Sequence, residues 1–149
     1  MLEMSGEERF DQDPDRVYAA LTDLKLLAKN IPDLVSHEIV GENELRCVVR
    51  PGFSFLRMTM KTRIVLVPEP AARTALMRVS SQGIGAAMDV ESRVSVTPAD
   101  SGALLQWSAQ VVKTTGLVST VSRDLVRAAA EQVIRSGWQQ IRAQLAATG

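Results

Sequence analysis

The sequence predicts an α+β fold in which a curved antiparallel sheet is wrapped around a long C-terminal helix. The centre of the chain, residues 34–113, is rich in β-branched residues and is interrupted by short clusters of turn-forming residues. Apolar and polar side chains alternate along parts of this region, which is typical of strands with one buried face. Residues 117–146 instead carry apolar side chains at steps of three and four, the spacing of an amphipathic helix.

The N-terminal region is expected to form one strand followed by two short helices. Apolar and polar residues alternate in residues 2–10, which predicts the strand. Asp13-Pro14 combines a capping carboxylate with a proline suited to the first helical position. Asp23 is expected to begin the second helix, which ends before Ile31-Pro32 because the residue before a proline disfavours helical geometry.

Six antiparallel strands are expected to follow as a meander. The alternation is clearest in residues 56–66, 88–97 and 105–111, each with one apolar face. The turns between them are too short for a crossover, so neighbouring strands are expected to run antiparallel. The apolar face of this sheet requires a cover. A helix over residues 117–146 would supply it, because at about 1.5 Å per residue it would be roughly 45 Å long.

The bulk composition narrows the functions open to the chain. A length of 149 residues is usual for one domain, and we expect residues 1–149 to form a single unit. The 17 basic and 17 acidic residues cancel, which argues against nucleic acid as a partner. The single cysteine, Cys47, excludes an internal disulfide and predicts a cytoplasmic protein. The acidic N-terminus does not resemble a signal peptide and no segment is apolar enough to span a membrane, so any membrane contact is expected to be peripheral, at the inner face.

Catalytic and metal-binding groups are scarce in the sequence. His37 is the only histidine, and we expect neither a metal site nor a cofactor. Cys47 lies among apolar strand residues, where a free thiol behaves as a small hydrophobe. Gly83-Ile84-Gly85 lies between two predicted strands with no helix behind it, which favours a sharp bend over a phosphate-binding loop. Glu8 falls on the apolar side of its strand, where it would act as an acid or base, or be neutralised by an arginine.

Methionines mark the candidate binding site. Met58, Met60 and Met88 fall on the predicted inner face, and methionine lines adaptable apolar pockets, although the same pattern also describes a filled core. Thr62 and Ser92 share that face and require hydrogen-bond partners, which a ligand headgroup, a water or the backbone would supply. The predicted ligand-binding residues are Met58, Met60, Thr62, Met88, Val90, Ser92, Trp107, Val121, Leu125 and Val133.

The order of strand, two short helices, six-stranded meander and long helix resembles the START-like (SRPBCC) superfamily. This superfamily is also called Bet v 1-like or polyketide cyclase-like, and its architecture is the helix-grip fold. The N-terminal third is similar to the CoxG family within it, a family of carbon monoxide dehydrogenase subunits. The motifs that carry this similarity are Met4-Ser5-Gly6-Glu7, Asp13-Pro14, Val17-Tyr18-Ala19-Ala20-Leu21, Asp23 and Ile31-Pro32.

The resemblance implies a binding protein with no set of catalytic residues. Helix-grip proteins hold hydrophobic molecules between sheet and helix, and the CoxG family is associated with membrane recruitment of carbon monoxide dehydrogenase, a molybdenum hydroxylase-type enzyme. We therefore expect a non-enzymatic module that binds a lipid or quinone-like molecule and assists a membrane-associated oxidoreductase. Two alternatives remain. One is a cyclase- or hydratase-type enzyme that uses Glu8 or His37, and the other is a docking subunit without an obligatory ligand.

Overall fold

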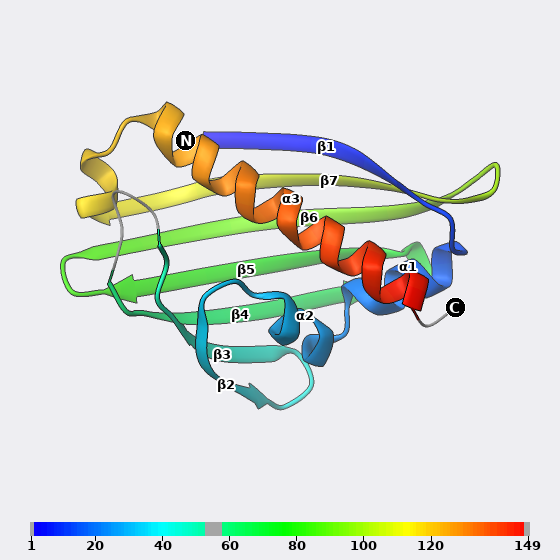
Figure 1. The fold of residues 1–149 in the computed structure, drawn as a ribbon, viewed down its shortest axis with the longest axis horizontal. Coiled ribbons are helices and arrows are strands. Elements are labelled where there is room, and N and C mark those ends of the chain that lie inside the picture. The colour runs from blue at the N-terminus through cyan, green and yellow to red at the C-terminus, as the bar shows by residue number, and fades with distance from the viewer. Residues whose placement is uncertain (1, 53–57, 148–149) are drawn as a thin grey trace.

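The computed structural model describes residues 2–52 and 58–147, and its main feature is a long helix lying across one face of a curved sheet (Figure 1). The elements are β1 (Leu2–Phe10), α1 (Pro14–Leu21), α2 (Leu24–Asn30), β2 (Leu34–Val40), β3 (Glu44–Val49), β4 (Met60–Glu69), η1 (Pro70–Ala72), β5 (Thr74–Gly83), β6 (Ala86–Ala99), β7 (Gly102–Gly116), η2 (Leu117–Thr120) and α3 (Arg123–Ala147).

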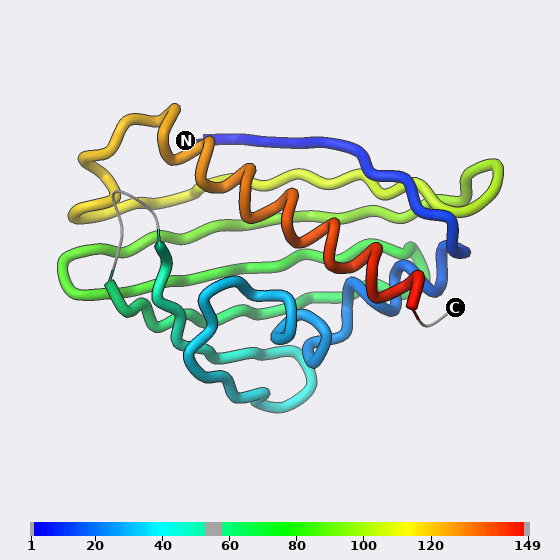
Figure 2. The backbone as a smooth tube through the Cα atoms, viewed as in Figure 1, coloured from blue at the N-terminus to red at the C-terminus, as the bar shows by residue number. Residues whose placement is uncertain are grey.

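The sheet has seven antiparallel strands in the order β1-β7-β6-β5-β4-β3-β2. Strands β2 to β7 are the predicted six-stranded meander, and β1 completes the sheet by pairing with β7. The tube view shows α3 crossing the sheet diagonally, from the N-terminal end of β1 to the side where α1 lies (Figure 2). The predicted α+β helix-grip architecture is therefore confirmed.

Both short helices begin at the predicted aspartates. The Asp13 carboxylate accepts hydrogen bonds from the backbone N–H groups of Asp15 at 3.0 Å and Arg16 at 3.1 Å. The Asp23 carboxylate accepts from Lys25 at 2.9 Å. These bonds satisfy N–H groups that have no partner inside a helix, so the local sequence is enough to fix where each helix starts.

The long helix begins later than its apolar spacing predicted. Residues Leu117–Thr120 form the 3-10 turn η2, and α3 starts only at Arg123, so the expectation of a helix from Leu117 is wrong. Gly116 has a φ of 66°, and Ser122 accepts a hydrogen bond from the N–H of Leu125 at 3.3 Å. A glycine turn and a serine cap thus place the helix start one turn and a half further along.

The glycine-rich segment between β5 and β6 is a turn, as expected. Gly85 has a φ of 74°, and its carbonyl accepts a hydrogen bond from the N–H of Leu117 at 2.8 Å. A Cβ atom on Gly116 would overlap the Gly85 carbonyl oxygen, so this end of the sheet depends on the absence of a side chain there. The β5–β6 turn and η2 consequently lie together at one end of the sheet.

Most of the buried apolar side chains belong to one of two groups on the inner face of the sheet, the face that α3 covers. Leu2 and Met4 on β1 and Ala109 and Val111 on β7 are buried but belong to neither group. The larger group, called here the packed end, lies where α1, α2 and the C-terminal part of α3 meet the strands. Its members are Phe10, Val17, Tyr18, Leu24, Ala28, Leu45, Cys47, Ile64, Leu66, Ala75, Val96, Ala103, Leu105 and Leu145. The smaller group, called here the small cluster, consists of Met60, Ala86 and Val118 near the β5–β6 turn. Between the two groups, the inner face of β5 and β6 is less completely covered, because Val79, Val90 and Ser92 are only partly buried.

Candidate ligand-binding site

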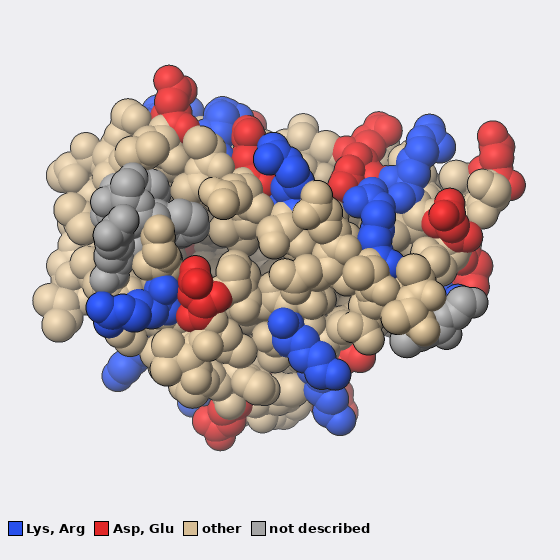
Figure 3. All heavy atoms as spheres, viewed as in Figure 1, with Lys and Arg blue, Asp and Glu red and all other residues tan. Residues whose placement is uncertain are grey.

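The space between the packed end and the small cluster is called here the recess. Its floor includes Val79 on β5 and Val90 and Ser92 on β6, which point to the inner face but keep part of their surface exposed. On the same face of β6, Val96 is only 1% exposed. The space-filling view shows a hollow between the N-terminal half of α3 and the segment joining α2 to β2 (Figure 3). An apolar floor that stays partly accessible under a helix is suited to an apolar ligand.

The C-terminal half of α3 is packed more closely against the rest of the protein than its N-terminal half. Its close backbone neighbours are β1, α1 and α2, and its one fully buried residue is Leu145, in the last turns. Val126, Ala130 and Ile134, in the N-terminal half, are spaced four residues apart and remain partly exposed. The N-terminal half of α3 therefore covers the recess without filling it.

A pair of hydroxyl groups provides the polar part of the floor. Thr62 Oγ1 on β4 and Ser81 Oγ on β5 lie 2.6 Å apart, and both residues are 9% exposed. Each hydroxyl carries one hydrogen, and the bond between them uses only one. The second hydrogen is free to be donated to another acceptor, such as a polar atom of a bound molecule.

Two tryptophans close the recess toward the packed end. Trp107 on β7 and Trp138 on α3 have ring centroids 6.4 Å apart, with the ring planes inclined by 43°. Both rings are partly exposed and pack against the packed end. They join sheet and helix at this point, so the recess is bounded by the tryptophans on one side and by the small cluster on the other.

Comparison with known proteins agrees with this architecture. The family model for CoxG, described as a subunit of carbon monoxide dehydrogenase, matches residues 6–146. This chain belongs to the CoxG family. A comparison with curated protein sequences finds no match.

Solved structures with the same fold share little sequence with this CoxG-family chain. A conserved protein from Geobacillus kaustophilus superimposes with a TM-score of 0.90 at 18% identity, covering 99% of this chain and 97% of the other. A START superfamily protein from Mycobacterium smegmatis has a TM-score of 0.75 at 12% identity, with 99% of both chains covered. Ara h 8.0201 has a TM-score of 0.75 at 17% identity, with 98% of both covered. These similarities show a START and Bet v 1-like fold.

The predicted site residues of this CoxG-family chain lie in several different parts of the structure. Val90, Ser92 and Trp107 border the recess, and Thr62 lies in its floor. Met60 is 1% exposed and belongs to the small cluster, against which Met58 and Met88 pack with partly buried side chains. The methionines therefore form one end of the recess and not its centre.

Two of the three predicted residues from the C-terminal segment are exposed, and the third precedes the helix. Val121 is in an extended conformation just before α3. Leu125 is 42% exposed and Val133 is 37% exposed. At about 100° per residue, Leu125 points roughly 200° around α3 from the buried Leu145, so its side chain faces away from the sheet. The four-residue spacing that predicts an inward-facing Leu125 starts at Leu117, before α3 begins at Arg123.

Sequence reasoning did not select Ser81 and Trp138 for the site. Ser81 pairs with Thr62 across neighbouring strands, and only the β4–β5 register reveals that the two residues are opposite each other. Trp138 belongs to the apolar stripe of α3, where its contact with Trp107 depends on the angle at which the helix crosses the sheet. The alternation of apolar and polar residues along one strand predicts neither the Thr62–Ser81 pair nor the Trp107–Trp138 contact.

The groups that an enzyme would need are engaged or exposed. Glu8 on β1 points to the inner face, where its carboxylate accepts a hydrogen bond from Arg142 at 3.3 Å. The Arg142 guanidinium also stacks over the Phe10 ring at 4.9 Å. His37 is exposed on the edge strand β2, two strands away from Thr62 in the floor of the recess. Among the described residues, no group of three or more His, Cys, Asp or Glu side chains could hold a metal ion.

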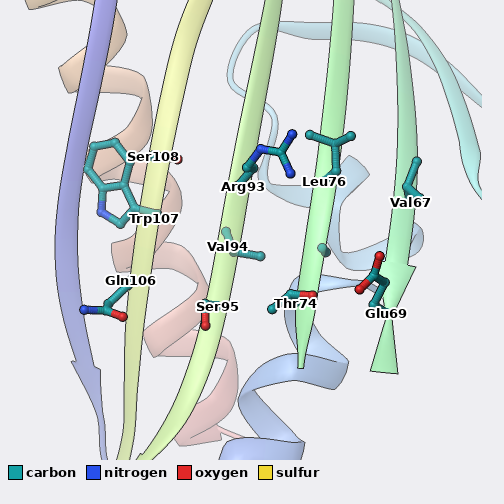
Figure 4. A pocket seen from close by; sticks show the side chains of 11 residues that line it. Val67, Glu69, Thr74, Leu76, Arg93, Val94, Ser95, Gln106, Trp107 and Ser108 are labelled. Atoms are coloured by element: carbon teal, nitrogen blue, oxygen red, sulfur yellow. The ribbon is translucent and has the colours of Figure 1, made fainter. Parts of the chain in front are cut away.

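A second hollow lies on the outer face of the sheet. It is a shallow depression of about 480 Å³, bordered by Val67, Leu76, Arg93 and Gln106 among others. The close-up shows these side chains on the face away from the helices (Figure 4). Since this depression has no helix over it, it offers a bound molecule much less burial than the recess does.

Proposed function

We propose that this CoxG-family chain binds an apolar small molecule, of lipid or quinone-like character, in the recess between the sheet and α3. The observation that supports this most is the partial exposure of Val79, Val90 and Ser92 on the same inner face of the sheet where Val96 is only 1% exposed. Burial of this apolar surface by a ligand would favour binding by about 25 cal/mol for each Å² removed from water. The free hydroxyl hydrogen of the Thr62–Ser81 pair would supply one polar contact for orientation.

Native mass spectrometry after mild purification tests this proposal. We expect the wild-type chain to carry a co-purified apolar molecule and Val90→Phe to lose it, because the larger ring would occupy the floor of the recess. Val67→Phe is the matched control, since it makes the same change at a 40% exposed position of the outer depression. Loss of the ligand in Val67→Phe but not in Val90→Phe would place the ligand on the outer face and refute the proposal.

We also propose that the chain assists a membrane-associated oxidoreductase of the molybdenum hydroxylase type. Membership of the CoxG family supports this role, as does an exposed apolar tip beside the recess. Ile84, in the β5–β6 turn, is 94% exposed, and Leu117 in η2 is 43% exposed next to it. None of the described helices is long and apolar enough to span a membrane. The exposed tip would allow a peripheral contact through which an apolar ligand passes between bilayer and recess.

Vesicle flotation tests the membrane contact. We expect the wild-type chain to float with vesicles of mixed neutral and anionic phospholipids, and Ile84→Asn to float several-fold less. Val35→Asn is the matched control, because Val35 is an exposed valine on β2 with 64% of its surface accessible. Equal flotation of the Ile84 and Val35 variants would show that the tip has no special role.

The docking-subunit alternative predicts a different result. A subunit that only recruits an oxidoreductase would keep its binding to purified carbon monoxide dehydrogenase in the Val90→Phe variant and would carry no ligand in the wild-type form. A ligand carrier would lose its ligand in that variant. The two measurements, made on the same pair of proteins, therefore separate the hypotheses.

A further inference from the structure

The floor of the recess carries hydroxyl groups at two places, with an apolar pair of side chains between them. On β5, Ser81 forms the 2.6 Å hydroxyl pair with Thr62 of β4. On β6, Ser92 lies on the same inner face and is only partly buried. Val79 and Val90 are opposite each other in the β5–β6 register, between the position of Ser81 and that of Ser92. The order along the floor is therefore polar, apolar, polar.

Ser92 is a single hydroxyl on an otherwise apolar patch. Its neighbours across the strands are Met77 on β5 and Ala109 on β7, neither of which carries a strong hydrogen-bonding side chain. Among the described residues, the Ser92 hydroxyl has no hydrogen-bond partner. A hydroxyl covered by carbon alone would lose its hydrogen bonds to water, so a molecule lying over Ser92 binds better with a polar group at that point.

The Thr62–Ser81 pair also retains hydrogen-bonding capacity. One hydroxyl hydrogen joins the two oxygens, and the other hydrogen remains to be donated. Because both residues are only 9% exposed, water has limited access to that hydrogen. An acceptor oxygen of a bound molecule would satisfy it, whereas an alkyl chain laid over the pair would leave it unpaired.

The distance between the two polar places follows from the geometry of the sheet. Ser81 is opposite Met88, and Ser92 lies four residues further along β6. At about 3.3 Å per residue and about 4.8 Å between strands, the backbone positions of Ser81 and Ser92 are roughly 14 Å apart. One small headgroup cannot reach both places. A molecule that contacts both must carry its polar groups at opposite ends of an extended body.

We infer that the recess binds an elongated apolar molecule with an oxygen-containing polar group, a hydroxyl or a carbonyl, at each end. One end accepts a hydrogen bond from the Thr62–Ser81 pair, the other end bonds to the Ser92 hydroxyl, and the apolar middle covers Val79 and Val90. The inference rests on the proposed function and narrows its ligand class, since a molecule with a single polar end would leave one of the two places unpaired.

Titration calorimetry with 1,10-decanediol and 1-undecanol tests this inference, on protein from which any co-purified molecule has been extracted. The two probes have chains of equal length and differ only in whether the second end is a hydroxyl or a methyl group. A recess with one polar place would prefer the mono-alcohol, because burial of an unpaired hydroxyl is unfavourable. We expect the wild-type chain to bind the diol at least as tightly as the mono-alcohol. A preference for the mono-alcohol would overturn the inference and leave the proposed function standing.

Substitutions test the two ends separately. Ser92→Ala removes one polar place, and the double variant Thr62→Val/Ser81→Ala removes the other without leaving a hydroxyl unpaired. We expect each to weaken binding of the diol about fivefold to tenfold, the effect of about one net hydrogen bond, and to change binding of the mono-alcohol much less. Ser95→Ala and Ser80→Ala are the matched controls, because Ser95 borders the outer depression of β6 (Figure 4) and Ser80 is exposed on the outer face of β5.

The variants also separate the inference from simpler explanations. An unchanged affinity of Ser92→Ala for the diol would show that this hydroxyl is only hydrated, and would overturn the inference. Equal losses for both probes, or the same loss in the control variants, would indicate a general change of the recess and would also overturn it. If neither probe binds the wild-type chain, the inference fails. If in addition no molecule co-purifies with the chain, the proposed function fails as well.

Discussion

The packed end and the recess lie on the same strands but differ in how completely they are covered. Val96 and Val90 both point to the inner face of β6, six residues apart, yet Val96 is 1% exposed and Val90 remains partly accessible. Their residue type and strand position are the same, so the sheet does not explain the difference. The difference comes from the elements above them, and it shows that an apolar strand face becomes core only where a second layer reaches it.

The cover at the packed end is made by three helices that meet there. Val17 and Tyr18 of α1, Leu24 of α2 and Leu145 of α3 are all buried in one group with the strands. Among the described residues, the N-terminal half of α3 is the one helical segment over the recess, and the small cluster closes the far side. The packed end supplies stability, which allows the recess to stay incompletely filled.

The largest expected difference is between truncation of Val96 and truncation of Val90, both on β6. Val96→Ala removes apolar carbon from a filled site, and we expect the free energy of unfolding to fall by about 2–3 kcal/mol, since lost burial and a new cavity add. Val90→Ala removes the same atoms from a partly exposed site, and the loss should stay below about 1 kcal/mol. Urea unfolding at equilibrium measures both.

The two alanine variants should be measured without a bound molecule, because a ligand in the recess would add its own stabilisation to the native state. Equal losses of free energy in the two variants would contradict the comparison. That result would mean that the recess is filled by side chains in solution.

Removing one hydrogen bond at the packed end should have a smaller effect. The Tyr18 hydroxyl donates to the Thr74 carbonyl at 2.8 Å and ties α1 to the start of β5. Tyr18→Phe should lower the free energy of unfolding by about 1 kcal/mol at neutral pH, because the carbonyl loses its partner. The ring stays in place, so the effect isolates the hydroxyl.

The same tyrosine gives a pH dependence whose sign follows from its burial. Burial raises the pKa of the Tyr18 hydroxyl above its ordinary value of 10.0, because the charged phenolate is disfavoured inside the protein. The stabilisation is therefore complete below the unfolded pKa and is lost as the pH rises through the alkaline range. Tyr18→Phe lacks this loss, so the gap between wild type and variant should narrow at high pH. Absorbance titration of this single tyrosine checks the shift.

The smallest effect is expected from the surface charges of the sheet. Glu44 on β3 accepts a hydrogen bond from Arg63 at 2.9 Å and pairs with Arg46, which together lower the pKa of its carboxyl from 4.5 to about 2. The resulting stability is present above pH 4.5 and is lost as the pH falls toward 2.

The Glu44→Gln variant measures that contribution. We expect a slightly lower melting temperature than wild type at neutral pH and no difference at the acid end of this range. Added salt should reduce the difference, because both arginines are 59% exposed. A difference that survives acid would assign the effect to side-chain packing instead of charge.

Local sequence was enough to predict most of the secondary structure. The two aspartate caps, the strand alternation around Thr62 and the turn at Gly83-Ile84-Gly85 depend on neighbouring residues, and the structure confirms them. The helix start at Leu117 was predicted wrongly because apolar spacing continues through the η2 turn. Part of the strand predicted over 56–66 lies outside the described residues.

The sequence by itself determined the strands, the caps and an apolar face that requires cover. It did so because these features depend on side-chain period and on bonds between near neighbours. Tertiary structure alone decided which part of that face is packed and which is left as a recess, that Glu8 meets Arg142, and that Trp107 meets Trp138. These contacts join residues that are distant in the chain, and the angle at which α3 crosses the sheet sets which of them form.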